Sequence, residues 1–334
     1  MKNFIKYFAI ISAVNLAAVN FALIPAKALA AGQPTNLQDS FDQIKQSVQD
    51  VQEGTQNLIT SKDDNNLTPE EKQKQELDNR LSVFGKILTL SINEATSTEK
   101  QLKALKNLDK EADSLRNQLV SEFDGFIKSY NDQKQTLEKP EAIDLVKIKE
   151  MAQSFKDWRT ATYLPEFEKA NDFLLINQQQ NTLEMAGNRF NKITSDIKNL
   201  KKQNLKGVEA LGNSLSLAAN SLKEAENLYK EAENKFWLIA NTLDSNASST
   251  IASSTISSEN LSNAATADNS SSTEIISPLQ NASSTDINPT STPSISIEDQ
   301  FLSIKGLVGD SLNKIKETYQ IFIEMSDFVK KLLI

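Results

Sequence analysis

Apolar residues recur along most of the chain at alternating steps of three and four, with polar residues between them. The first such run contains Leu37, Phe41, Ile44, Val48, Val51 and Leu58. Steps of this kind align apolar side chains along one side of an α-helix and form the heptad seam of a coiled coil. The spacing stays helical to about residue 243, which predicts an all-α fold: an elongated antiparallel helical bundle or coiled coil over residues 36–243.

Local signals predict where one helix ends and the next begins. Thr68 has the signature of an N-cap, with Pro69 at the first helical position and Glu71 completing a capping box. The sequence leaves open whether the helix is continuous at 95–101, where Thr96 and Glu99 form a second candidate capping box. It predicts further interruptions at Pro140, in WRTATYLPE at 158–166 and in QNLKG at 203–207. The last of these indicates either a local unwinding of the coil or a real break at Gly207.

Residues 244–297 differ sharply from the segment before them. They are rich in Ser, Thr and Asn and contain no Lys, Arg or aromatic residue. Such a segment buries too little apolar surface to offset the entropy lost on ordering. The composition therefore predicts a disordered linker between the bundle and the C-terminal segment.

Residues 298–334 carry one apolar stripe and are predicted to form a C-terminal amphipathic helix. Its candidate contact face consists of Phe301, Ile304, Val308, Ile315, Tyr319 and Phe322. Three roles for this helix are open. It docks on the bundle, it binds a partner helix or a second subunit, or it lies on a membrane surface. The nearly balanced charge of the segment disfavours the membrane role, because interfacial helices tend to be rich in Lys and Arg on the polar face.

The N-terminal residues 1–30 have the features of a secretory signal peptide. Two lysines precede an apolar stretch, and Ala28-Leu29-Ala30 matches the small-x-small pattern of a cleavage site. The alternative is an uncleaved membrane anchor, which the polar residues Asn15 and Asn20 disfavour. The segment predicts an exported protein, extracellular or periplasmic and bacterial in character, with residues 31–35 as a short lead to the first helix.

Composition excludes several kinds of chemistry. The chain has no cysteine and no histidine, so Ser-His-Asp and Cys-His nucleophilic sites and His or Cys zinc sites cannot form. The formal charge of −8 disfavours nucleic acid as a partner. Acidic side chains are plentiful, but the pairs that can be placed lie on exposed helix faces, where nothing raises one pKa for acid–base work. We expect no enzyme activity, no cofactor and no metal.

Two segments are candidates for ligand contact. An aromatic group around Pro165 consists of Phe155, Trp158, Tyr163 and Phe167, and it either stacks on a sugar or peptide or closes the end of the bundle. The segment DDNNLTPEE at 63–71 has oxygen ligands suited to calcium but lacks the glycine and spacing of an EF-hand, which favours a plain loop.

The sequence resembles no family by specific residues. It favours an exported, non-enzymatic structural or interaction protein that binds itself or a protein partner through coiled-coil surfaces. One alternative is a membrane-active helical protein that resembles α-helical pore-forming toxins in shape, although no apolar hairpin suited to insertion is present. The other alternative is a helical holdase chaperone.

Overall fold

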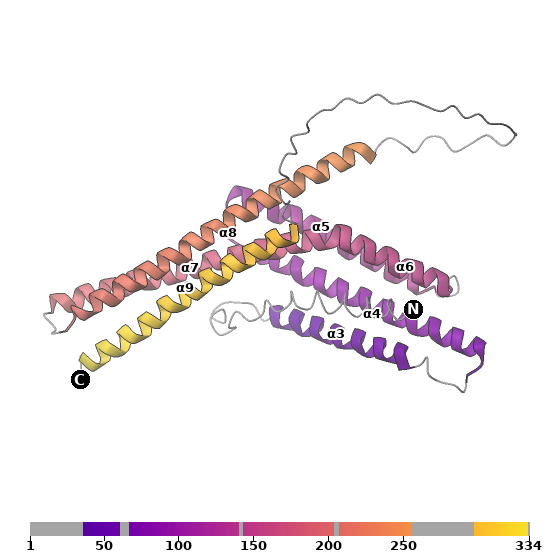
Figure 1. Ribbon diagram of the computed structural model, residues 1–334, viewed down its shortest axis with the longest axis horizontal. Helices are drawn as coiled ribbons and strands as arrows, with labels where there is room; N and C mark the ends of the chain where they lie inside the picture. The colour runs from indigo at the N-terminus through magenta and orange to yellow at the C-terminus, as the bar shows by residue number, and fades with distance from the viewer. Residues whose placement is uncertain (1–35, 61–66, 140–142, 204–206, 255–296, 333–334) are drawn as a thin grey trace, which may run out of the picture. The chain divides into compact units, whose positions relative to one another are not determined.

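The computed structural model describes residues 36–60, 67–139, 143–203, 207–254 and 297–332 (Figure 1). Its helices are α3 (Asn36–Thr60), α4 (Pro69–Ala104), α5 (Lys110–Leu137), α6 (Leu145–Trp158), the π-helix η4 (Arg159–Tyr163), α7 (Leu164–Lys202), α8 (Ala210–Ser254) and α9 (Ile297–Leu332). Among the described residues every regular element is a helix and none is a strand. The predicted all-α class is confirmed.

The chain divides into two compact units, Met1–Asn181 and Thr182–Ile334. The described part of unit 1 contains α3 to α6, η4 and the first part of α7. Unit 2 contains the rest of α7, α8 and α9. The boundary lies inside α7 and inside the segment 36–243 that the sequence predicted as one bundle, and no break in the apolar pattern marks it.

In unit 1, α3, α4 and α5 run antiparallel in succession. The side chain of Asn93 on α4 donates to Ser47 Oγ on α3 at 2.8 Å, and Lys134 on α5 donates to Thr89 Oγ1 on α4 at 3.1 Å. The seam residues that these helices bury include Ile44, Val48, Val51, Leu58, Phe84, Leu88, Leu115 and Leu119. Gly54 allows the close approach of α3 and α4, because an added Cβ would lie 3.2 Å from side-chain atoms of α4.

The start of α4 has the predicted capping box. The hydroxyl of Thr68 accepts from the backbone N–H of Glu71 at 3.3 Å, and the Glu71 carboxylate accepts from the Thr68 backbone N–H at 2.9 Å. Pro69 is the first residue of the helix, where its missing N–H costs no hydrogen bond. This helix boundary could be predicted from the sequence because the capping signal is local.

The sequence left open whether the helix is continuous at 95–101, and in the structure it is. Helix α4 continues through this segment to Ala104. The break instead follows it, where Asn107 adopts a positive φ of 59° and the Asp109 side chain caps α5 by accepting from the Ala112 N–H. Asn tolerates this left-handed backbone better than most residues, and Asp is a preferred N-cap.

The interruption predicted at 158–166 is wrong, because the chain stays helical there as a π-helix. Residues Arg159–Tyr163 form a π-helix that joins α6 directly to α7. At Gly207 the outcome is a real break. Helix α7 ends at Lys202, α8 begins at Ala210, and Gly207 has a φ of 89° that L-residues rarely adopt.

In unit 2, the second part of α7 packs with α8 and α9. One core cluster contains Ile197, Val208, Leu211, Ala218, Phe322 and Met325, and a second contains Ala186, Ala225 and Ile315. Helices α8 and α9 are antiparallel neighbours, since Lys235 donates to Ser303 and Ser311 donates to the Ala225 carbonyl. Small alanines let the three helices approach closely.

Several sequence predictions fall outside the described residues. These are the signal peptide at 1–30, the lead at 31–35 and most of the predicted linker, 255–296. Helix α8 runs to Ser254 and so enters the segment predicted as linker. Within the part of the chain that the structure describes, no helix has both the length and the apolar character needed to cross a membrane.

Candidate functional site

The π-helix of unit 1 arises where the sequence places Pro165 just after the helix turn. Pro165 has no N–H to donate to Ala161, which removes one α-helical hydrogen bond. The turn widens, and the N–H of Leu164 bonds the carbonyl of Arg159 five residues back. Arg159 and Tyr163, the first and last residues of the π-helix, are both buried in unit 1.

Arg159 is the centre of a buried polar network. Its Nη2 donates to Glu94 Oε2 on α4 at 2.5 Å, and its Nη1 donates to the Tyr130 hydroxyl on α5 at 3.0 Å and to Ser91 Oγ at 3.3 Å. The guanidinium also lies over the Tyr163 ring, 4.4 Å from its centroid. We call Arg159, Glu94, Tyr130, Ser91 and Tyr163 the Arg159 cluster.

Electrostatics fix the charge of the Arg159 cluster. Burial would lower the pKa of Arg159, but the charge of Glu94 and its hydrogen bond outweigh this and raise the pKa above its usual value. Burial raises the pKa of the Tyr130 and Tyr163 hydroxyls. Arg159 therefore stays charged and both tyrosines stay neutral near neutral pH. None of these three side chains is poised to exchange protons as a general acid or base.

The predicted aromatic group lies around this cluster. Phe155, Tyr163 and Phe167 are buried and Trp158 is half-buried. Tyr130 joins them, with ring centroids 5.8 Å from Phe155, 5.4 Å from Trp158 and 5.6 Å from Tyr163, and Phe167 stacks on Tyr163 at 5.5 Å. The rings cover one another in edge and stacked contacts. This packing favours a structural role over stacking on an external sugar.

Sequence reasoning missed Arg159 and Glu94. A signal was present in α4, where the apolar seam through Leu88 and Leu102 continues at Ser91, Ala95 and Thr98. Polar residues at such positions are buried here, and a buried polar helix face needs a polar partner from another helix. Polar residues at these core positions of α4 would have indicated an internal charge pair.

A second titratable group in unit 1 lies between α5 and α7. Glu122 accepts from Gln118 at 3.1 Å, and Lys169 lies 2.7 Å from Glu166 Oε2. Burial, followed by the hydrogen bond and charge of Glu166, raises the pKa of Glu122 to about 7, against the opposing effects of Lys169 and Gln118. The carboxyl group of Glu122 thus changes charge near neutrality.

The predicted contact face of the C-terminal helix lies in the core of unit 2. Phe301, Ile304, Val308, Ile315 and Phe322 are buried and Tyr319 is half-buried. The Phe322 ring centroid is 6.4 Å from that of Phe190 on α7 and 5.7 Å from that of Tyr319. The face is therefore occupied by α7 and α8 within the same unit.

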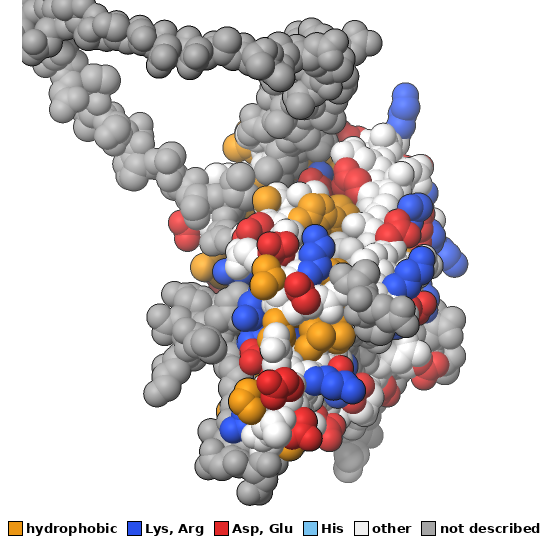
Figure 2. Space-filling view, turned by 90° about the vertical axis from the view of Figure 1, so that its right-hand side faces the viewer, with side chains coloured by type: hydrophobic (Ala, Val, Ile, Leu, Met, Phe, Trp, Pro, Cys, Tyr) orange, Lys and Arg blue, Asp and Glu red, His pale blue; other side chains and the backbone are white. Residues whose placement is uncertain are grey.

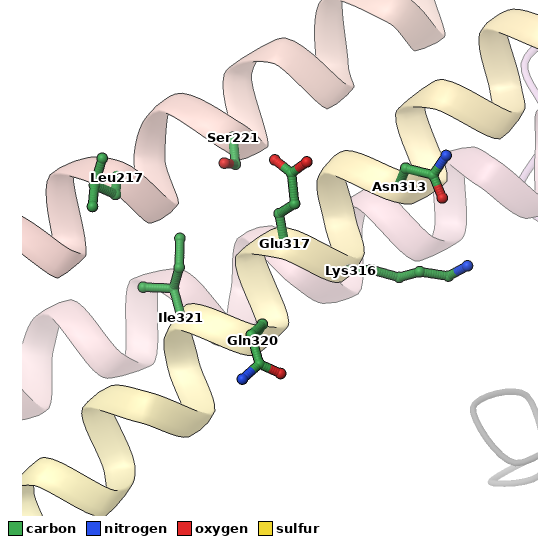
Figure 3. Close-up of a pocket in the computed structure, with 7 residues that line it drawn as sticks. All are labelled: Leu217, Ser221, Asn313, Lys316, Glu317, Gln320 and Ile321. Atoms are coloured by element: carbon green, nitrogen blue, oxygen red, sulfur yellow. The ribbon is translucent and has the colours of Figure 1, made fainter.

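A shallow groove runs along the outer side of the α8–α9 contact. Its lining residues are Leu217, Ser221, Asn313, Lys316, Glu317, Gln320 and Ile321. Figure 3 shows Glu317 pointing toward Ser221 and Ile321 toward Leu217, with the groove open between them. Leu217 and Ile321 are the apolar side chains of its lining, the other five are polar or charged, and the groove does not enclose a ligand.

Helices α8 and α9 each expose two large apolar side chains. Leu217 and Leu238 on α8 are 59% and 69% exposed, and Leu302 and Ile323 on α9 are 68% and 56% exposed. Each pair lies three heptads apart. The α8 row consists of Leu217, Glu224, Glu231 and Leu238; the α9 row consists of Leu302, Gly309, Lys316 and Ile323.

Elsewhere the surface is of mixed charge. Figure 2 shows one face on which positive and negative side chains are interspersed and apolar ones form small separate groups. Among the described residues no three or more Asp or Glu side chains gather so as to hold a metal ion. Residues 63–66 of the DDNNLTPEE segment, which the sequence weighed as a calcium loop, lie outside the described part.

No protein-family model matches the chain, and neither a curated protein nor a solved structure is significantly similar to it.

Proposed function

We propose that the protein is an exported, non-enzymatic interaction protein that binds itself or a protein partner through its helical surfaces. Export follows from the features of residues 1–30, and the cell envelope or extracellular space is the proposed location. The proposed arrangement is antiparallel coiled-coil packing of the helices with a disordered linker after Ser254. Together these features describe a protein that acts by contact.

The observation that carries the proposal is the pair of exposed rows on α8 and α9. Single exposed leucines are normal on protein surfaces. Here α8 and α9 each expose two large apolar side chains three heptads apart, with polar residues or glycine at the heptad positions between them, while other faces of both helices form the core of unit 2. Exposed apolar side chains on the outside of a helical bundle offer contacts to a further helix.

The lack of histidine and cysteine supports a non-enzymatic role, as does the state of the Arg159 cluster. Its charges are paired internally and its rings are packed on one another. A catalytic arginine or carboxylate needs access to a substrate, whereas these groups are covered by α4, α5 and η4.

The test uses the mature chain, residues 31–334, made with an affinity tag and without the signal segment. Sedimentation velocity measures self-association, and capture from the producing cells followed by mass spectrometry measures partner binding. We expect either a concentration-dependent assembly or a captured protein that is lost when Leu217 and Leu238 are changed to Glu. A mature chain that is monomeric and captures nothing sensitive to these changes would overturn the proposal.

Two further measurements separate the alternatives. Leakage of vesicles made from anionic and zwitterionic lipid would indicate a membrane-active protein. Suppression of aggregation of an unfolded client at substoichiometric amounts would indicate a holdase. We expect neither activity.

A further inference from the structure

One end of unit 2 carries exposed lysines from two different helices. The last turns of α7 and α9 meet there, because Leu200, Val208 and Phe328 belong to one core cluster. Figure 1 shows the end of α9 and the start of α8 at the same end of the unit. We call the exposed cations at this place the lysine end; they are Lys198, Lys201, Lys202, Lys330 and Lys331.

Lysines in the last turn of a helix are common, because they offset the negative end of the helix dipole. Each of the other last-turn lysines has a partner within the chain; they are Lys103, Lys134 and Lys156. Among the described residues, by contrast, no side chain forms an ion pair or a hydrogen bond with Lys201, Lys202 or Lys331. Helix dipoles alone therefore do not account for unpaired lysines on two helices that end at one place.

The acids at the lysine end are too few to balance its charge. Over residues 198–202, 207–211 and 327–331 they are Glu209 and Asp327, and Asp327 already lies 3.0 Å from Lys330. The acidic start of α9 is remote. Asp310 is about 30 Å from Lys330 at 1.5 Å per residue, which is about three screening lengths at 0.1 M salt. The lysine end is therefore positive although the chain as a whole carries −8.

The chemistry of the lysine end favours an anionic membrane surface over an acidic protein. Its cations are all lysines, whose ammonium groups attract negative charge without a fixed geometry, whereas sites that hold one carboxylate or phosphate in place favour arginine. Half-buried Phe328 and Val329 border Lys330 and Lys331. Apolar side chains beside lysines are the combination that contacts with anionic membrane surfaces use.

The structure also removes the charge argument that disfavoured a membrane role for the C-terminal helix. Residues 298–334 taken alone are nearly balanced in charge. Lys198, Lys201 and Lys202 lie far earlier in the chain, on α7, and only the packing of unit 2 adds them to the two lysines of α9. The positive end is thus a property of the folded unit.

We propose that the lysine end of unit 2 binds the surface of a membrane that contains anionic phospholipid. The contact is peripheral, with ammonium groups at the lipid phosphates and no helix inserted. This inference goes beyond the proposed function, which names a protein partner, and does not depend on it. It gives the protein a second contact at the proposed location, the cell envelope.

The test measures how much of the mature chain, residues 31–334, sediments with vesicles. One set contains equal parts of phosphatidylglycerol and phosphatidylcholine, and the other contains phosphatidylcholine alone. The lysine-end variant combines Lys201→Gln, Lys202→Gln and Lys331→Gln. The matched control removes three exposed lysines elsewhere and combines Lys45→Gln, Lys74→Gln and Lys223→Gln. Circular dichroism establishes that both keep their helix content, which Gln favours on exposed helix positions.

We expect the unchanged chain to bind the anionic vesicles at about 0.1 M salt and to leave the neutral ones unbound. Each lysine near an anionic surface contributes about fivefold in affinity, so the lysine-end variant should bind about 100-fold more weakly. The control should bind like the unchanged chain. No binding to anionic vesicles, equal binding to both vesicles, or an equal loss in the control overturns the inference.

Two further arms separate other sources of negative charge. Glycerol phosphate, the soluble form of the head group, should not displace the chain when its concentration equals that of the lipid phosphate. Displacement would indicate a site for a single phosphate and overturn the surface contact. A protein captured from the producing cells through the lysine end, without vesicle binding, would overturn it in favour of an acidic protein.

The outcomes are independent of those for the proposed function. That function is tested by the changes at Leu217 and Leu238, which leave the lysine end intact. If vesicles are not bound but assembly or capture depends on those leucines, the membrane inference fails alone. Leakage of vesicle contents on binding would contradict a peripheral contact and indicate a membrane-active protein.

Discussion

The two units bury different kinds of core. In unit 2 the buried hydroxyls of Ser311 and Thr318 donate to the carbonyls of Ala225 and Lys314, and the remaining buried side chains are aliphatic, aromatic or alanine. Among the described residues, every buried charged side chain lies in unit 1, including the pair Arg159 and Glu94. The apolar pattern of a sequence therefore predicts the apolar core of unit 2 well and the charged part of the core of unit 1 poorly.

This difference has an energetic side. An apolar helix interface gains stability roughly in proportion to the area that it removes from water. A buried ion pair gains little in total, because desolvation offsets the attraction, but removing one partner is expensive. Unit 2 should therefore respond gradually to side-chain size, whereas the Arg159 cluster should respond sharply to the loss of a single charge.

The largest effect is expected when α9 is released from unit 2. Changing Ile315 and Phe322 together to Asp places two charges in an apolar core and removes two buried side chains worth about 1.5–3 kcal/mol each. We expect unit 2 to lose most of its stability. Chemical denaturation in a Trp158→Phe background, where Trp237 is the remaining tryptophan, reports on unit 2. An unchanged transition would show that α9 does not stabilise this unit.

The next effect concerns the charge pair of unit 1. Arg159→Met or Glu94→Leu alone should cost about 3–5 kcal/mol, because each leaves an uncompensated buried charge. The double variant should cost much less than the sum. Denaturation followed through Trp158 in a Trp237→Phe background gives the coupling energy by a double-mutant cycle. Additive single effects would mean that Arg159 and Glu94 act independently.

A smaller effect depends on pH. The pKa of Glu122 is raised from 4.5 to about 7, so its protonated form is favoured in the folded state. That contribution to stability is present below about pH 4.5 and is lost as the pH rises through about 7. Glu122→Gln should therefore stabilise unit 1 above pH 8 by about 1 kcal/mol, a value reduced for the part of the side chain that water reaches.

The control for the pH effect is the same comparison in acid. At pH 4 the protonated Glu122 carboxyl group and the Gln amide are both neutral, so the free energies of unfolding should agree. A stabilisation that is equal at both pH values would assign the effect to side-chain shape and contradict the charge argument.

The smallest effect concerns the cap of α4. Thr68→Ala removes the hydroxyl that accepts from the Glu71 N–H and should cost about 1 kcal/mol. Thr68→Ser retains the hydroxyl and should cost a few tenths at most. Both are measured through Trp158. Equal losses in the two variants would show that the capping hydrogen bond contributes nothing.

What the sequence could predict follows from how local each signal is. The capping box at Thr68 and the helical stripes each depend on residues a few positions apart, and the structure contains them. At Gly207 the local signal left two outcomes open, and the structure has a real break there. The break at 105–109 was missed because Leu102 and Leu105 keep the apolar spacing intact. Only the backbone of Asn107 and the cap at Asp109 end the helix.

The Arg159 cluster could not be predicted in the same way. Its members come from α4, α5 and η4, and their meeting depends on how three helices pack. A charged residue on a helix reads as solvent-exposed unless its partner is known. The exposed apolar residues on α8 and α9 belonged to no predicted pattern, and their exposure became clear only once the core-facing sides of both helices were known.

The π-helix at Arg159–Tyr163 also explains how the buried stripe stays in register from α6 to α7. The buried positions Ile148, Ala152, Phe155, Arg159, Tyr163, Phe167 and Ala170 are separated by steps of four, three, four, four, four and three. A regular seam alternates steps of four and three. The three consecutive steps of four therefore contain one residue more than the regular pattern. In an α-helix that extra residue would rotate all later side chains by about 100° and turn the stripe away from the core. The wide turn absorbs it, so the buried stripe faces the core both before and after Arg159–Tyr163.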